Sequence, residues 1–254
     1  MTTTNDETGE EQGRRTRDGQ HVTRVHDELR NRILRGEMQP GTSMSQVELA
    51  ELLDAGRTPL REALRLLQSE GLIENEPNRN VRVAEFTLDD VEDLYLMRIS
   101  LECSAALVTV PELAPSDIAE LGGLITQMEY FETEREHVGW ETPHRAFHLK
   151  LVSGAGPQTR RTIEQLWDHA ERYRRFYELA DPPPWLLRVA EHRGLLDAAK
   201  AGDGEKVSKL LALHYAGTVV ETVHGAGSSA ELKTLRIILK KFAGTDRLPK
   251  PASK

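Results

Sequence analysis

Four of the nine histidines stand where they could share a metal ion. His144 and His148 are four residues apart, so on a helix they lie one turn apart, a spacing that lets two imidazoles bind one ion. His192 and His214 each fall on the apolar face of a later segment with helical periodicity. Each histidine alone is more simply a core residue satisfied by hydrogen bonds. The four together favour a divalent cation, because one ion would satisfy all of them.

Arg98 has the periodicity of a buried side chain. It shares a helical stripe with Leu94 and Leu101, which predicts that its guanidinium points into the core. A buried arginine needs a carboxylate or phosphate partner. Glu102, one turn further on, could be that partner, and so could an anionic ligand.

Arginines that could read DNA alternate with leucines between positions 57 and 68. The apolar stripe of this predicted helix consists of Leu60, Ala63, Leu64 and Leu67. Its polar stripe consists of Arg57, Arg61, Arg65 and Gln68. Arginine pairs bidentately with guanine in the major groove, and the first turns of a recognition helix lie nearest the bases. This favours Arg57, Thr58 and Arg61 as readers. Pairing of the arginines with Glu62 on a solvated surface is the alternative, and the spacing leaves both open.

The segments around these arginines predict a winged helix-turn-helix over residues 21–86. A first helix follows from the apolar periodicity after Val22, and a Ser45–Glu48 capping box begins a second. A third begins with Thr58 as its cap and Pro59 in its first position, and ends at Gly71. Residues 72–75 and 81–83 should pair as a two-stranded wing, whose Arg79 and Arg82 could reach the adjacent groove. Residues 1–20 lack periodicity and are expected to form a disordered tail.

Helical periodicity then continues almost to the end of the chain. The expected helices are 88–109, 116–134, 140–152, 159–179, 185–201, 204–223 and 230–242. They predict an antiparallel bundle of six to seven helices over residues 87–224. Residues 225–254 form an extension whose leucine-rich helix could serve dimerisation or packing. The expected fold class is therefore mainly α, a winged helix-turn-helix followed by an all-α bundle.

Composition narrows the class of protein further. The sequence has no long uncharged apolar run that would predict a membrane span, and its polar N-terminus does not resemble a secretory signal. The single Cys103 fits a reducing, cytoplasmic location. The net charge of −8 argues mildly against nucleic-acid binding, although a small basic surface can lie on an acidic protein.

Residues 21–83 resemble the DNA-binding domain of the GntR family of bacterial transcription regulators. The similarity is carried by residues 29–36 (LRNRILRG), 40–42 (PGT), 45–50 (SQVELA) and, most specifically, 57–64 (RTPLREAL). It implies that Arg57 and Arg61 read bases and that Arg30, Thr58 and the wing turn contact the backbone or groove. The family usually has serine at position 56 and glycine at position 80. A polar cap is therefore expected to be missing at Gly56, and Asn80 is expected to tolerate a left-handed wing turn.

Residues 87–224 resemble the FadR-type C-terminal ligand-binding domain known as FCD. Many members hold a metal with one aspartate and three histidines, the first two in an Asp-x-x-Phe-His pattern that residues 144–148 (HRAFH) match with His144 in place of the aspartate. An all-imidazole set suits Zn²⁺, or Ni²⁺, and disfavours Ca²⁺ and Mg²⁺. In FCD domains an arginine in the helix that contains Arg98 helps to bind a carboxylate effector, and the resemblance implies that role for Arg98.

The sequence thus predicts a DNA-binding transcription repressor rather than an enzyme. As a homodimer it would read an inverted repeat in double-stranded DNA, and a small organic acid bound beside the metal would modulate that binding. One alternative is a zinc hydrolase on the helical bundle, although no glutamate stands inside the His-x-x-x-His pair. Another is a regulator whose metal is purely structural, or one with no metal.

Overall fold

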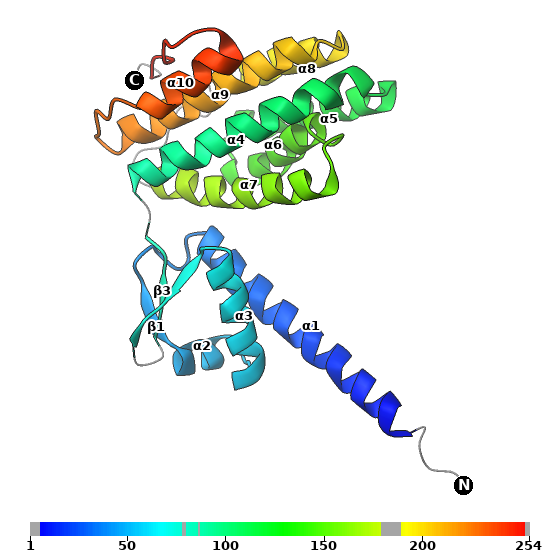
Figure 1. The fold of residues 1–254 in the computed structure, drawn as a ribbon, viewed down its shortest axis with the longest axis vertical. Helices are drawn as coiled ribbons and strands as arrows, with labels where there is room; N and C mark the ends of the chain where they lie inside the picture. The colour runs from blue at the N-terminus through cyan, green and yellow to red at the C-terminus, as the bar shows by residue number, and fades with distance from the viewer. Residues whose placement is uncertain (1–5, 78–79, 86, 179–188, 252–254) are drawn as a thin grey trace. The chain divides into compact units, whose positions relative to one another are not determined.

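The computed structural model describes residues 6–77, 80–85, 87–178 and 189–251. These belong to two compact units, Met1–Phe86 and Thr87–Lys254 (Figure 1). The architecture is mostly helical, with one small antiparallel sheet in the first unit, which confirms the expected fold class.

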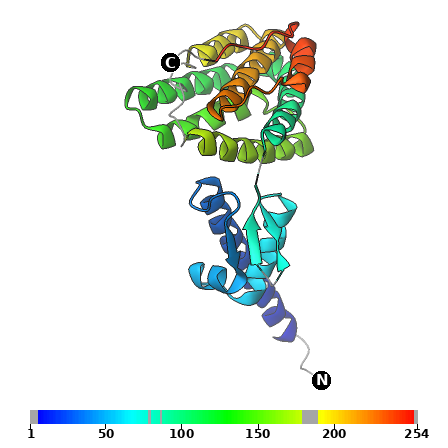
Figure 2. The ribbon, with the colours of Figure 1, turned by 90° about the vertical axis from the view of Figure 1, so that its left-hand side faces the viewer.

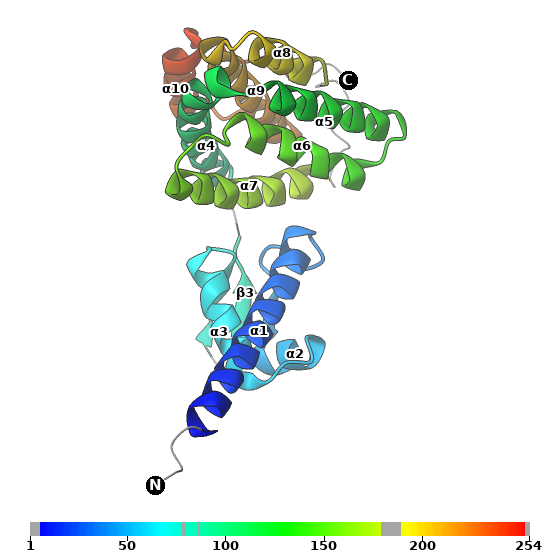
Figure 3. The same cartoon turned by 90° about the vertical axis from the view of Figure 1, so that its right-hand side faces the viewer.

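The first unit is a winged helix-turn-helix in which α1 packs against α3 (Figure 3). Its elements are α1 (Asp6–Leu34), β1 (Ser43–Ser45), α2 (Gln46–Leu52), α3 (Arg57–Ser69), β2 (Ile73–Asn75) and β3 (Asn80–Val83). Each helix buries one apolar face in a common core, to which α1 contributes Val25 and Leu29, α2 Leu49, and α3 Leu60 and Leu67. The opposite face of α3 is left to solvent.

The sheet has three strands where the sequence predicted two. Its order is β1–β3–β2, with both pairings antiparallel and Ser43 opposite Arg82. The sequence Ser-Met-Ser of β1 is short and mostly polar, so it carries no local strand signal. It is extended because β3 offers it a free edge.

Three local predictions in this unit need correction. The Ser45–Glu48 capping box is present, but α3 begins at Arg57, so its N-cap is Gly56 rather than Thr58 and Pro59 is its third residue. As expected, Gly56 supplies no side-chain cap. Asn80 is an extended residue of β3 opposite Ser45, not a left-handed turn residue.

The tail was expected to be disordered, yet α1 begins at Asp6. This segment is rich in glutamate and arginine, which have high helix propensity, and most of its acidic residues lie in its first two turns. These preferences act without an apolar stripe, which is the signal that the periodicity analysis required.

The second unit is a bundle arranged around α4 (Leu88–Thr109). The chain continues through η2 (Val110–Glu112), α5 (Pro115–Thr133), α6 (His137–Leu151), α7 (Pro157–Glu178), α8 (Val189–Lys200), α9 (Gly204–Gly225) and α10 (Lys233–Ala243). Seven α-helices are therefore described in this unit, close to the expected ranges, and residues 185–188 of the predicted fifth helix lie outside the described part. Helix α4 packs on α9, α7 and α10 (Figures 1 and 2).

Helix α4 is apolar because it lies inside the bundle. By length and composition Leu88–Glu112 could cross a membrane, but 56% of its 18-residue apolar stretch is buried within the protein. Thr87 and Asp90 form a capping box at its start. The apolar stretch is thus explained by packing on the neighbouring helices.

The C-terminal helix α10 packs on its own chain. Leu235, Leu239 and Ala243 are buried, and the helix lies against α4 and α9. At its start, the Leu235 backbone N–H donates to Glu92 Oε1 of α4 at 2.8 Å. This places the predicted leucine stripe of the extension in a packing interface.

Candidate nucleic-acid interface and candidate metal centre

The exposed face of α3 carries the residues expected to read DNA. Arg57, Thr58, Arg61, Arg65 and Gln68 are all exposed, while the leucine stripe of the same helix is buried. This is the amphipathic arrangement that the two stripes predicted, and it leaves a cationic face available to a polyanion.

These arginines differ in how closely they pair with neighbouring carboxylates. Arg65 Nη1 lies 2.9 Å from Glu62 Oε1, whereas Arg61 Nε lies 4.0 Å from the same oxygen. No ion pair of Arg57 occurs among the described residues. Arg57 and Arg61 are therefore the freer pair, and they also border a groove of about 890 Å³ between α2 and α3 that Gln46 and Val47 help to line.

Arg30 and the wing arginines lie in other surroundings. Arg30 Nε donates to Glu70 Oε2 at 3.2 Å, and His26 Nε2 lies 2.7 Å from the other oxygen of that carboxylate. Arg82 pairs with Glu76 and Glu85 on the wing, and Arg79 lies outside the described residues. Arg30 thus joins α1 to the end of α3 and is not gathered with the α3 arginines.

The pair of His26 and Glu70 shifts the pKa of both residues. Hydrogen bonding to Glu70 outweighs partial burial and raises the pKa of His26. Burial alone would raise the pKa of Glu70, but His26 and Arg30 together lower it. Each group therefore stabilises the charged form of the other.

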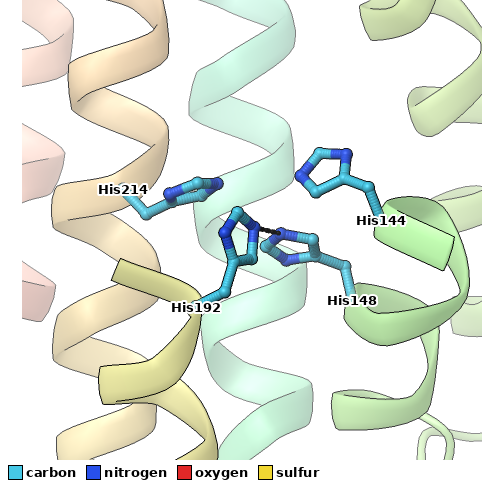
Figure 4. A group of neighbouring side chains, drawn as sticks. All are labelled: His144, His148, His192 and His214. Atoms are coloured by element: carbon cyan, nitrogen blue, oxygen red, sulfur yellow. Dashed lines mark hydrogen bonds between the residues drawn. The ribbon is translucent and has the colours of Figure 1, made fainter. Parts of the chain in front are cut away.

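The four predicted histidines come together inside the second unit. His144 and His148 extend from α6, His192 from α8 and His214 from α9, and their rings converge on one point (Figure 4). All four are buried, and one nitrogen from each lies within 4.8 Å of the corresponding nitrogens of the others. The structure therefore brings together all four candidate ligands from three separate helices.

The geometry of the cluster suits one metal ion. His148 Nε2 and His192 Nε2 are 3.1 Å apart. Two nitrogens at about 2.0 Å from a tetrahedral ion would be roughly 3.3 Å apart, so this pair is already near ligand spacing. Among the residues that the structure describes, the ligand set contains imidazoles alone, which suits a borderline transition metal rather than Ca²⁺ or Mg²⁺.

Two of the histidines have outer hydrogen-bond partners that the sequence analysis missed. His214 Nδ1 lies 2.7 Å from Glu191 Oε2, and His148 Nδ1 lies 3.2 Å from the hydroxyl of Tyr215. Such partners orient a ligand histidine and leave its other nitrogen for the ion. Glu191 stands one residue before His192, and Tyr215 one after His214, but nothing in the sequence indicates which histidine each contacts.

Arg98 is buried, as its periodicity predicted, and is connected to this cluster through Trp167 and Tyr215, whose ring centroids lie 5.1 and 5.6 Å from that of His148. Its Nε donates to Glu102 Oε1 at 2.8 Å, and its guanidinium carbon lies 4.1 Å from the ring centroid of Trp167 and 4.3 Å from that of Tyr215. Burial alone would lower the pKa of Arg98, but the Glu102 carboxylate raises it. Arg98 Nη2 is buried with no hydrogen-bond partner among the described residues.

Glu102 is thus the carboxylate partner that the sequence offered as one alternative. Its Oε2 also accepts hydrogen bonds from Trp167 Nε1 at 3.0 Å and from the Tyr215 hydroxyl at 2.5 Å. Burial, together with the charge of Glu102, raises the pKa of Tyr215 well above its usual value, so the hydroxyl keeps its proton.

Comparison with known proteins identifies both units. Residues 21–83 match the model for bacterial regulatory proteins of the gntR family, and residues 93–217 match the FCD domain. An HTH-type transcriptional regulator from an unstable DNA locus of Streptomyces ambofaciens is 32% identical over 182 residues, 70% of this chain and 75% of that protein. The HTH-type transcriptional repressor GlaR of Escherichia coli K12 is 27% identical over 73% of this chain and 88% of its own length.

A solved structure agrees in fold over both units. E. coli McbR/YncC superposes with a TM-score of 0.71 at 26% identity, covering 81% of this chain and 98% of that one. The fold and the site therefore define a DNA-binding transcription regulator with a winged helix-turn-helix and a helical C-terminal domain. The chain belongs to the GntR family and carries an FCD domain.

Proposed function

We propose that this regulator is a repressor that binds an inverted-repeat operator as a homodimer, and that a small organic acid bound beside a divalent metal sets its affinity for DNA. The observation that carries this proposal is the convergence of four buried imidazoles within 4.8 Å, linked through Tyr215 to the buried Arg98. The cluster is buried in the second unit, whereas the DNA-reading helix belongs to the first, so we assign the cluster to ligand binding by the second unit.

The DNA-reading part of the proposal is supported by the exposed face of α3. Arg57 and Arg61 would pair with guanine edges, and Thr58 with Arg65 would hold the helix against the groove. The uncapped first turn of α3 presents backbone N–H groups that also suit a phosphate. Repression is supported by the name of the relative GlaR.

The homodimer is supported by an apolar stripe on the outer side of α4. Met97, Leu101 and Val108 recur at helical spacing, interrupted by the polar Ser104, and Met97 and Val108 are 47% and 61% exposed. A second copy of the chain would cover this stripe. A two-fold pair of reading heads would then recognise an inverted repeat.

The metal would be held by the four histidines, with Zn²⁺ preferred and Ni²⁺ the alternative. Four neutral ligands leave the full charge of the ion uncompensated, which favours an anionic ligand nearby. When bound, the ion would supply a Lewis-acidic position for a carboxylate oxygen. Arg98 Nη2 would hold the effector through its second oxygen or its second carboxylate.

A zinc hydrolase on the same bundle is the less favoured function. Such an enzyme needs a carboxylate free to act as general base. Among the described residues near the cluster, Glu102 already accepts three hydrogen bonds and Glu191 is hydrogen-bonded to His214. The relatives named above are transcription regulators.

Metal content per chain tests the proposal directly. Untagged wild-type protein should hold near-stoichiometric Zn or Ni, and the double variant His144→Ala, His148→Ala should lose it, as measured by elemental analysis. If the wild-type protein takes up neither ion after incubation, the four histidines are packing residues of the core and not metal ligands. Arg98 would then remain as the sole anchor for an effector.

A further inference from the structure

Glu102 joins the arginine and the histidine cluster through one buried carboxylate. The side chain is fully buried in α4, and its two oxygens accept hydrogen bonds from three helices. Arg98 of α4 occupies Oε1, while Trp167 of α7 and Tyr215 of α9 share Oε2. A carboxylate so occupied is held in a single position.

The hydrogen bond from Tyr215 to Glu102 determines which atom donates in the contact between Tyr215 and His148. Tyr215 has one hydroxyl proton, and the short 2.5 Å contact assigns it to Glu102 Oε2, since an ionised carboxylate can only accept. The Tyr215 oxygen is then left to accept from His148 Nδ1, 3.2 Å away. This makes His148 the tautomer that is protonated on Nδ1.

That tautomer leaves the lone pair of His148 Nε2 inside the cluster. His148 Nε2 lies 3.1 Å from His192 Nε2, within hydrogen-bond distance of that nitrogen. The same His148 nitrogen would be the ligand atom for a metal ion held in the cluster. The chain of contacts from Glu102 through Tyr215 to His148 therefore leaves this nitrogen available to a metal ion.

We propose that Glu102 and Tyr215 are positioning residues that preset His148 as a metal ligand and thereby tie metal affinity to the state of Arg98. The inference rests on the proposed metal site. Because the same carboxylate also holds Arg98, an anion that draws the guanidinium away through Nη2 leaves more of the Glu102 charge for Tyr215. The hydrogen bond to His148 then strengthens, and anion and metal favour each other.

Zinc affinity of full-length variants tests this proposal. Tyr215→Phe removes one hydroxyl, and we expect it to weaken Zn²⁺ binding by about 10–100-fold in competition with a chromophoric chelator. Tyr95→Phe is the matched control, because Tyr95 is equally buried and also lies against Arg98 but makes no hydrogen bond to Glu102 among the described residues. Its zinc affinity should equal that of the wild type. Equal affinities for Tyr215→Phe and Tyr95→Phe would overturn the proposal.

A second variant shows whether Glu102 acts through Tyr215. In Glu102→Gln the zinc affinity should fall by a similar factor, and combining it with Tyr215→Phe should add little, because both remove the same chain of contacts. Additive losses would show that the two residues act separately. Thermal unfolding of each variant checks that it is folded.

The histidine tautomer gives a readout that does not need bound zinc. Two-dimensional NMR of metal-free protein with ¹⁵N-labelled histidine should show His148 protonated on Nδ1 in the wild type and in Tyr95→Phe, and a mixture in Tyr215→Phe. His148 protonated on Nε2 in the wild type would overturn the proposal. A wild type with the expected tautomer but no zinc binding would instead disprove the metal site and leave the positioning intact.

Discussion

Among the residues that the structure describes, the two most deeply buried charged side chains form a pair. Arg98 is 1% exposed and Glu102 is fully buried, and each is the principal charged partner of the other. Removing one member of such a pair leaves the other charge buried and unpaired. Neither residue can therefore be replaced alone by an uncharged one without a loss of stability. Arg98 thus has a structural role in addition to any role in binding an effector.

Arg98→Ala should destabilise the second unit by about 3–5 kcal/mol. The double variant Arg98→Met, Glu102→Gln should recover much of that loss, because neither side chain is then charged. All three tryptophans, Trp140, Trp167 and Trp185, belong to this unit, so urea unfolding followed by tryptophan fluorescence reports on it alone. A loss under about 1 kcal/mol for Arg98→Ala would show that the pair is dispensable for folding.

Arg57→Ala and Arg61→Ala should each weaken operator binding by about 1–3 kcal/mol and leave binding to random DNA nearly unchanged. Both side chains are exposed and weakly engaged by local acids. Arg65→Ala is the comparison, and it should cost less because Glu62 already pairs with Arg65. Fluorescence anisotropy at one fixed salt concentration measures all three. Equal losses on operator and random DNA would mean that these arginines contact phosphates alone.

The sequence predicted those site residues whose burial or partner follows from the pattern of their own helix. Helical periodicity placed the four histidines and Arg98 on buried faces, and spacing offered Glu102 as a partner. Trp167 and Tyr215 were missed because they reach Glu102 from 65 and 113 residues away in the chain. Such contacts depend on how helices pack, and no local pattern contains that information.

Among the elements, α1 and α3 are joined by a titratable link at His26, Arg30 and Glu70. The raised pKa of His26 means that its contribution to stability is complete below its unfolded value of about 6.5 and is lost as the pH rises through the folded value. The lowered pKa of Glu70 means that its contribution is complete above about 4.5 and is lost as the pH falls. The link is therefore strongest between about pH 4.5 and 6.5.

His26→Gln should lower the stability of the first unit near pH 6 and have little effect near pH 8.5. The expected loss is about 0.5–1 kcal/mol, on the scale of partly exposed ion pairs. Thermal unfolding of wild type and variant at both pH values, followed by circular dichroism, measures the difference. The same loss at both pH values would show that His26 acts by packing rather than by charge.

Helix α10 should stabilise the second unit through its buried face. Leu239→Ala removes a fully buried side chain between α10 and the bundle and should cost about 2–5 kcal/mol. Ile237→Ala on the same helix is the control, because Ile237 is 73% exposed and should change stability by less than about 0.5 kcal/mol. Tryptophan fluorescence again follows the unfolding. Similar values for the two variants would mean that α10 does not support the bundle.

The elements themselves were predicted where a helix has its own apolar stripe. The helices of the bundle match their expected ranges within a few residues in the described part, because burial there imposes the 3.6-residue period. Strand β1 was missed because its pairing with β3 is a tertiary contact. The start of α1 was missed because residues 6–20 have no apolar stripe, so helix propensity was their main helical signal.

For the whole molecule, the proposed regulation requires that a buried site in one unit affect DNA binding by the other. The chain carries its reading arginines and its histidine cluster in separate compact units. Metal binding in the second unit changes operator affinity if, and to the extent that, the ion binds differently to the free protein and to the DNA complex. Metal affinity and operator affinity are therefore two measurements of one coupling.

Zn²⁺ should change operator affinity by about 5–150-fold, the range of typical coupling energies, and operator DNA should change zinc affinity by the same factor. Anisotropy measures the first quantity with and without Zn²⁺, and chelator competition measures the second with and without operator. His144→Ala, His148→Ala should abolish both effects while keeping operator binding, because α3 is untouched. If zinc affinity is the same with and without operator, the ion stabilises the bundle without regulating it, and the regulatory ligand must act at Arg98 alone.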